Sequence, residues 1–216
     1  MIEFFFDCSS PWTYIAFRNI QPLAKELKAD IMWKPVLVGG IFNSANKNAY
    51  AAREDMNSAR NRYVLKDVQD NAREAGLRVV FPPKVFPVNS VKAMRGCLWI
   101  AQDDKAKDKY LAFIEATFAA YFTREEDISQ DDVLQAICVQ VGIDATAFMH
   151  GVTRPGIKEQ LKANTDEAIA RGAFGVPTYF IGEDMYFGND RLALLRSALL
   201  REKTSLRPAK VPPDAL

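Results

Sequence analysis

The stretch FFFDCSSPWTYIA, residues 4–16, places a strand-like apolar run directly before the start of a helix. Ser10 followed by Pro11 suits a helix N-terminus, because a serine oxygen can cap the first amides and proline fits the first helical position. Apolar residues then recur at helical spacing after Trp12. Two interpretations of Ser10 are open here: a helix cap, or a hydroxyl that takes part in chemistry.

Strands at both ends of the chain are expected to frame a helical middle. IEFFF (2–6) and DIMWKPVLVGG (30–40) are predicted strands around the first helix, which makes a βαβ unit with parallel strands. VPTYFIG (176–182) and EDMYF (183–187) are predicted to form a hairpin before a closing helix over 189–202. Helical spacing occupies 58–76, 90–102, 104–122, 129–142 and 153–172, and a proline-rich, irregular segment spans 78–90.

This order of elements is typical of an α/β protein with a thioredoxin-like β-α-β / β-β-α domain and an all-helical insertion domain. We assign residues 1–40 and 172–203 to the split thioredoxin-like domain, 41–171 to the helical insertion, and 204–216 to a polar, proline-bearing tail.

Composition narrows the functional class. The 216 residues are 49% hydrophobic and 25% charged, which is ordinary for a globular protein, and the net charge of +1 gives no electrostatic reason to expect nucleic acid or an anionic membrane as partner. No apolar run approaches the roughly 20 residues that span a bilayer. The N-terminus lacks the basic region of a signal peptide, so a cytoplasmic location is expected.

Cysteine and histidine usage excludes several kinds of site. Cys8, Cys97 and Cys138 are odd in number and lack CxxC spacing, which favours reduced thiols over disulfides or zinc ligands. His150 is the one histidine, so a Ser-His-Asp or Cys-His site would depend on it alone. We interpret His150 as a surface residue near a helix end and expect no metal site.

The position of Ser10 in the expected fold favours a chemical role for its hydroxyl group. In a thioredoxin-like fold this strand-to-helix junction holds the CxxC pair, at a helix N-terminus whose partial positive charge favours a thiolate. Here Ser10 and Thr13 replace both thiols, and Cys8 lies two residues too early. Dithiol exchange is therefore not expected. We expect instead that the hydroxyl donates a hydrogen bond to a ligand's sulfur.

The second informative stretch is FGVPTYFIGEDMYFGNDRL, residues 174–192. Pro177 at a strand start predicts a cis-proline, and Val176 before it would expose backbone groups that pair with a bound peptide. Gly188, Asn189 and Asp190 then open the last helix, either as an ordinary cap or as amide donors for a carboxylate with Asp190 available for an ammonium. A ligand that spans both motifs would be a small peptide with a central thiol.

Together these two stretches resemble the 2-hydroxychromene-2-carboxylate isomerase family, close kin of the kappa-class glutathione transferases. The segments VGGIFN (38–43), RYVLKDVQDNA (62–72) and FPVNS (86–90) resemble it too, and the likeness extends from about residue 2 to about residue 202. The resemblance implies a DsbA-like fold, bound glutathione, a homodimer, and a role in aromatic catabolism such as naphthalene degradation.

The resemblance also implies residue roles. Ser10 matches the catalytic serine, which we expect to hold the glutathione sulfur, and Val176 with Pro177 matches the loop that pairs with the cysteinyl unit. The segment that holds the γ-glutamyl end corresponds to Phe187, Gly188, Asn189 and Asp190. For the small aromatic carboxylate substrate the candidates are Asn43, Asn57 and Arg62, each of which fits a solvated surface position equally well; Asn43 stands where some members carry lysine.

The implied reaction converts 2-hydroxychromene-2-carboxylate to trans-o-hydroxybenzylidenepyruvate, with glutathione as the thiol nucleophile and no net redox change. Three alternatives remain. A kappa-like glutathione transferase or peroxidase would use the same site on another electrophile. A thiol-disulfide oxidoreductase would need the missing CxxC. A non-catalytic thioredoxin-like binding module would show no glutathione affinity.

Overall fold

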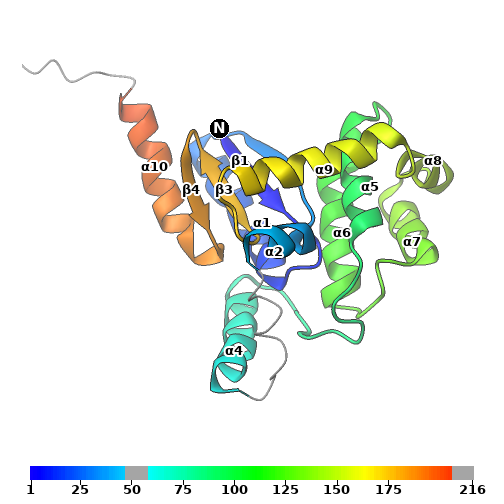
Figure 1. The fold of residues 1–216 in the computed structure, drawn as a ribbon, viewed down its shortest axis with the longest axis horizontal. Helices are drawn as coiled ribbons and strands as arrows, with labels where there is room; N and C mark the ends of the chain where they lie inside the picture. Colours follow the sequence, from blue (N-terminus) through cyan, green and yellow to red (C-terminus); the bar gives the residue numbers. More distant parts are fainter. Residues whose placement is uncertain (47–57, 206–216) are drawn as a thin grey trace, which may run out of the picture.

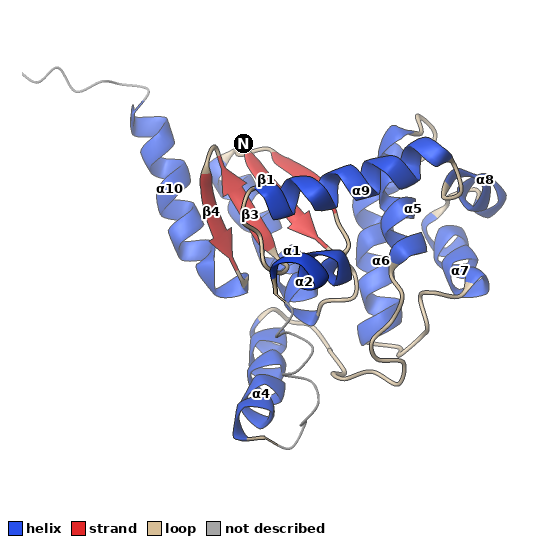
Figure 2. Cartoon of the chain, viewed as in Figure 1, coloured by secondary structure: helices blue, strands red, loops and turns tan. Residues whose placement is uncertain are grey.

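A computed structural model describes residues 1–46 and 58–205 and contains a mixed four-stranded sheet (Figure 2). The strands are β1 (Ile2–Phe6), β2 (Ile31–Pro35), β3 (Thr178–Ile181) and β4 (Asp184–Phe187), in the order β2-β1-β3-β4. β1 and β2 are parallel, whereas β1–β3 and β3–β4 are antiparallel. The predicted βαβ opening and the predicted C-terminal hairpin are confirmed, and the chain is an α/β protein with a thioredoxin-like sheet.

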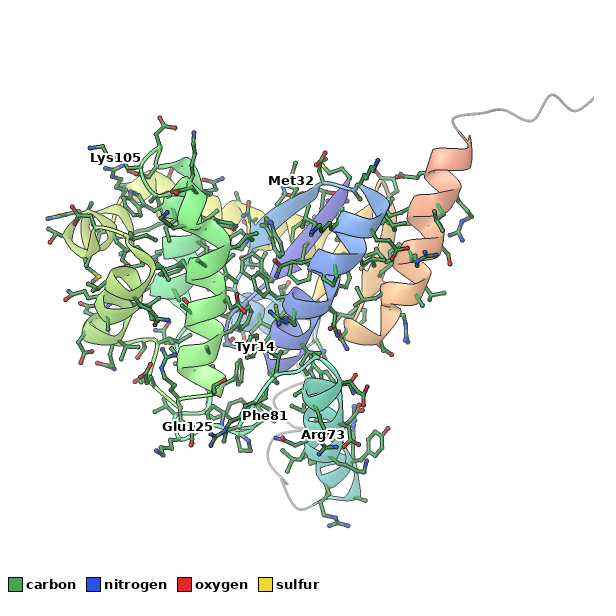
Figure 3. The ribbon with its side chains drawn as sticks, turned by 180° about the vertical axis from the view of Figure 1, so that it is seen from behind. Tyr14, Met32, Arg73, Phe81, Lys105 and Glu125 are labelled. Carbon is green, nitrogen blue, oxygen red and sulfur yellow. The ribbon has the colours of Figure 1, made fainter. Side chains whose placement is uncertain are left out.

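Both faces of the sheet are buried. Alternate residues of β1 point to opposite faces, so the strand contributes side chains to a core on each side. Phe4 and Phe6 pack with Phe17 of α1 (Pro11–Leu27) in the main core, whereas Phe5 packs with Ile41 and Ala168 in a second core cluster. Figures 1 and 3 view the molecule from these two sides, with α2 and α9 in front of the sheet in the first and α1 in front in the second. The near-continuous apolar run of β1 follows from this double burial.

The second strand is shorter than the sequence pattern predicted. The expected strand over 30–40 ends at Pro35, and helix α2 (Val38–Ala45) occupies the region of the double glycine. A Cβ added at Gly40 would lie 3.1 Å from the Thr165 side chain of α9. Glycine at this position therefore lets α2 pack closely against α9. The apolar run after Pro35 leads into a helix and does not extend the strand.

Most of the middle of the chain is helical, as predicted, and shares a continuous core with the sheet. The stacked rings of Tyr14 and Phe118, with centroids 4.9 Å apart, join α1 to α6, and Figure 3 labels Tyr14 where the two helices meet. Residues 78–90 are irregular, as expected. The helical elements are α4 (Ala59–Glu74), α5 (Val91–Gln102), η1 (Lys107–Lys109), α6 (Tyr110–Phe122), α7 (Asp131–Val141), α8 (Ala145–Gly151) and α9 (Pro155–Ala170).

The C-terminal segment adds η2 (Asn189–Arg191) and α10 (Leu192–Ser205) after the hairpin. The predicted closing helix over 189–202 is therefore divided into two elements and runs slightly into the predicted tail; residues 206–216 of that tail lie outside the described residues. Helix α4 projects from the body of the molecule on the side where β1 gives way to α1 (Figure 1). Over the described ranges, no helix has both the length and the apolar character needed to cross a membrane.

Candidate active site

Ser10 joins the helix cap and the proline loop. It is the N-cap of α1, and its Oγ accepts a hydrogen bond from the Thr13 N–H at 3.3 Å. The same hydroxyl donates to the Val176 carbonyl oxygen at 3.4 Å, and the residue is 9% exposed. Ser10 is therefore a cap and also a contact to the loop before β3, so the two interpretations of the sequence are compatible.

The loop before β3 contains the predicted cis peptide bond between Val176 and Pro177. The Gly188 N–H donates to the Pro177 carbonyl oxygen at 3.0 Å, and the Thr178 hydroxyl donates to the Gly175 carbonyl oxygen at 2.8 Å. A Cβ at Gly175 would lie 2.9 Å from the Phe187 ring, so glycine is needed for this close approach. These contacts hold the end of β4 against the proline loop.

A cavity of about 480 Å³ opens beside Ser10 and Val176. The rings of Phe174 and Phe187, with centroids 4.4 Å apart, form part of its wall. Arg60 is the one charged residue among the described residues that line it. The other lining residues are Ser9, Pro11, Trp12, Val38, Phe42, Asn46, Asn61, Val64, Leu65, Phe81, Phe86 and Gly175. A flat, largely apolar ligand with one negative charge suits this cavity.

The predicted substrate residues do not line this cavity. Asn43 on α2 and Arg62 on α4 are exposed and absent from the wall, and Asn57 lies outside the described residues. Asn46, which follows the last residue of α2, and Arg60 of α4 line it instead. Arg60 and Arg62 are two positions apart on α4 and therefore about 200° apart around the helix axis, so they lie on different faces of the helix. The helical face is the signal that could have identified Arg60.

The predicted γ-glutamyl segment is placed next to the site but is partly used for structure. Phe187 lines the cavity, and Gly188 has a φ of 101° that favours glycine. The Asn189 side chain accepts from the Asn19 amide at 3.0 Å and donates to Asn71 Oδ1 at 3.2 Å, which joins α1, η2 and α4. Asp190 is exposed and forms an ion pair with the neighbouring Arg191.

Asp7 is a buried carboxyl group directly before the Ser10 turn, and the sequence interpretation gave it no role. It accepts hydrogen bonds from the Ser9 and Val38 N–H groups, both at 2.9 Å, and one from the Ser90 side chain. Burial raises the pKa of Asp7 above its ordinary value, and these hydrogen bonds oppose that effect. Asp7 also lines a second cavity of about 350 Å³, which shares Ser9, Val38, Phe42 and Phe86 with the first.

Cys8 points into the protein core. Its thiol is fully buried, and its N–H donates to the Met94 sulfur at 3.3 Å. Burial, with smaller effects from Cys97 and Asp7, raises the pKa of Cys8 well above the ordinary thiol value. All three cysteines are free and buried, and His150 is exposed in the last turn of α8. Within residues 1–46 and 58–205, no group of three or more metal-ligating side chains is brought together.

Comparison with known proteins finds relatives that match over most of the chain. The chain is 27% identical to the 2-hydroxychromene-2-carboxylate isomerase of Pseudomonas putida over 201 residues, which cover 93% of this chain and 95% of the relative. It is 26% identical to the human (Homo sapiens) glutathione S-transferase kappa 1 over 215 residues, with 94% and 91% covered. A solved structure of 2-hydroxychromene-2-carboxylate isomerase matches with a TM-score of 0.75 at 27% identity and covers 95% of this chain and 98% of that one.

The profile of the DSBA-like thioredoxin domain matches residues 1–200, nearly the whole of the described chain. The sheet order, the cis-proline loop and the helix that starts at Ser10 are the structural counterparts of that match. The chain therefore belongs to the DSBA-like thioredoxin domain family, in which the isomerases of 2-hydroxychromene-2-carboxylate and the kappa-class glutathione transferases are its relatives.

Proposed function

We propose that this protein is a glutathione-dependent isomerase that converts 2-hydroxychromene-2-carboxylate to trans-o-hydroxybenzylidenepyruvate. The observation that carries the proposal is the contact between the Ser10 hydroxyl and the Val176 carbonyl at the wall of an aromatic cavity. The isomerase relatives, which match over almost their full length, supply the reaction class.

The donor set of the site suits glutathione. The Ser10 hydroxyl can turn from the Val176 carbonyl toward a sulfur atom while its oxygen still caps α1. In this proposal the backbone of Val176 pairs with the cysteinyl unit, and the exposed carboxylate of Asp190, three residues after the end of β4, exchanges its ion pair with Arg191 for one with the ammonium group. Phe187 and Val176 both line the cavity. The tripeptide would therefore lie along the proline loop with its thiol at Ser10.

Bound glutathione supplies a thiol nucleophile that adds to the conjugated carbon of the substrate and leaves again unchanged. The protein's part is to favour the anionic form of that sulfur and to orient the substrate. A hydrogen bond from Ser10 and the partial positive charge at the start of α1 both stabilise an anion. The apolar walls exclude water, which strengthens these interactions.

Substrate recognition is assigned to the cavity wall. The aromatic side chains can stack on a flat bicyclic ring system. Arg60 offers a guanidinium to the substrate carboxylate and is the one cation on the described lining. The sequence candidates Asn43 and Arg62 are left with surface positions in this proposal.

The direct test follows the ultraviolet absorbance of 2-hydroxychromene-2-carboxylate with purified protein, with and without glutathione. Fast conversion that requires glutathione supports the proposal. Absence of conversion by protein that binds glutathione in calorimetry contradicts the isomerase reaction and favours a second candidate, a kappa-like transferase or peroxidase, which the kappa relatives suggest. Absence of both conversion and glutathione binding contradicts both and favours a non-catalytic binding module.

A further inference from the structure

We propose that Asp7 is a positioning residue of the sulfur site: its buried carboxylate holds the Ser9–Ser10 turn against the starts of α2 and α5. The inference rests on the proposed function, because it concerns how the Ser10 hydroxyl is presented to glutathione. Neither the resemblance to known families nor the predicted site residues gave Asp7 a part in this chemistry.

The first support is that Asp7 binds both amides of the turn. Its backbone carbonyl accepts the Ser10 N–H at 3.2 Å, and its carboxylate Oδ1 accepts the Ser9 N–H at 2.9 Å. Displacing Ser10 relative to Asp7 would therefore break at least one of these hydrogen bonds. The orientation of the catalytic hydroxyl depends on this one residue as well as on the cap of α1.

The second support is that the other carboxylate oxygen reaches the opposite wall. Oδ2 accepts the Val38 N–H at 2.9 Å, and Ser90 adds a side-chain hydrogen bond. Val38 is the first residue of α2, which also carries Phe42 of the cavity wall and is followed by Asn46, and Ser90 precedes α5. A single carboxylate thus sets the separation between the hydroxyl donor and the wall that faces the substrate.

The third support is the energetic cost of the arrangement. Asp7 is 1% exposed, and among the described residues no cation lies within ion-pair distance of it. A buried carboxylate without a cation is expensive, and its partners here are backbone N–H groups and the hydroxyls of Ser9 and Ser90. An apolar residue could not accept these hydrogen bonds, so the carboxylate is what links the three segments at this point.

The experiment compares two variants that weaken the same contact in different ways. Asp7→Asn keeps the size but can accept only one of the two N–H groups well, because its NH2 group faces the other. Val38→Pro keeps the carboxylate and removes one donor; proline suits the first position of α2, and Leu37 before it is extended, as a residue before proline should be. The control is Asp127→Asn, since Asp127 likewise accepts the N–H two residues on, from Ser129 at 3.0 Å, in the α6–α7 connection.

The readouts are glutathione affinity by calorimetry, the thiolate absorbance of bound glutathione in the ultraviolet, and turnover. For Asp7→Asn we expect a lower thiolate fraction and kcat/KM reduced about tenfold, the scale of one hydrogen bond to a charged group. Val38→Pro should change both in the same direction, and Asp127→Asn should change neither.

Results that overturn this inference differ from results that overturn the proposed function. If Asp7 acted only through its charge, Asp7→Asn would raise the thiolate fraction, because removing a nearby negative charge favours another anion. That result, or unchanged values in a wild-type-like fold, overturns the inference while the proposed function stands. If wild-type protein binds no glutathione, both are overturned. If Asp7→Asn fails to fold, Val38→Pro decides between the same outcomes.

Discussion

The Ser10 hydroxyl oxygen lies 3.4 Å from the carbonyl oxygen of Val176, although 166 positions separate the two residues in the chain. The contact closes the gap between the helix that follows β1 and the loop that precedes β3. Because β1 and β3 are neighbours in the sheet, their loops meet at one end of it. The site is therefore a product of sheet order, and four predictions follow from its geometry.

Replacing Ser10 by alanine should separate catalysis from stability. Ser10→Ala removes a cap, at a cost of about 1 kcal/mol of unfolding free energy. It also removes the hydroxyl donor, so glutathione-dependent turnover should fall by about 100-fold or more. Urea unfolding and the absorbance assay measure the two effects.

The matched control for Ser10 is Asp144→Ala, which removes the cap of α8, where Asp144 accepts the Ala147 N–H at 2.9 Å. It should lose a similar amount of stability and keep full activity. Near-normal turnover in folded Ser10→Ala protein would contradict the role assigned to the hydroxyl.

Gly188 should matter for glutathione binding beyond its effect on the backbone. Its φ of 101° and ψ of 155° are accessible essentially to glycine alone, and a Cβ there would lie 2.6 Å from Asp190 Oδ1. Gly188→Ala should therefore displace the Asp190 carboxylate and weaken glutathione binding, as measured by calorimetry. Gly182→Ala is the comparison, because Gly182 also has a positive φ, 57°, but no atom lies within 4 Å of the added Cβ. Equal affinities in the two variants would argue against Asp190 as the ammonium partner.

Arg60 should affect the substrate and not glutathione. We expect Arg60→Gln to raise KM for the chromene carboxylate about tenfold or more, the scale of a lost charge-assisted hydrogen bond, with a smaller effect on kcat. Arg62→Gln, which replaces a residue of the same helix that does not line the cavity, should leave both constants near wild type. Steady-state kinetics at saturating glutathione test this, and a loss of glutathione affinity instead would place Arg60 on the tripeptide.

The native thiols should resist alkylation. Burial raises the pKa of Cys138 to about 12 and raises that of Cys8 well above the ordinary thiol value, so little thiolate is present at pH 8. Iodoacetamide followed by mass spectrometry should find Cys8 and Cys138 unmodified in native protein and modified in urea. Because a raised pKa delays ionisation, the native rate should increase only at strongly alkaline pH. Rapid native labelling of Cys8 would show that this thiol is open to the active site.

Local patterns predicted most of the elements. The cap and proline at Ser10 and Pro11, the apolar run of β1 and the proline at the start of β3 each have a short-range physical cause, and each is present as expected. The double glycine is an exception, because its pattern predicts the end of a strand, whereas Gly40 allows two helices to pack closely. Helix α8, at seven residues, was too short for its periodicity to be recognised.

The sequence by itself determined the positions of β1, β3 and β4, the helix cap at Ser10 and the absence of a CxxC pair, since these depend on neighbours within a few residues. Only the tertiary structure decided which face of α4 meets the cavity and therefore that Arg60 rather than Arg62 lines it. It also decided that Asp7 reaches Val38 and Ser90, because contacts between distant segments depend on how the helices pack across the sheet. Those long-range contacts turn a common helix cap into a candidate catalytic group.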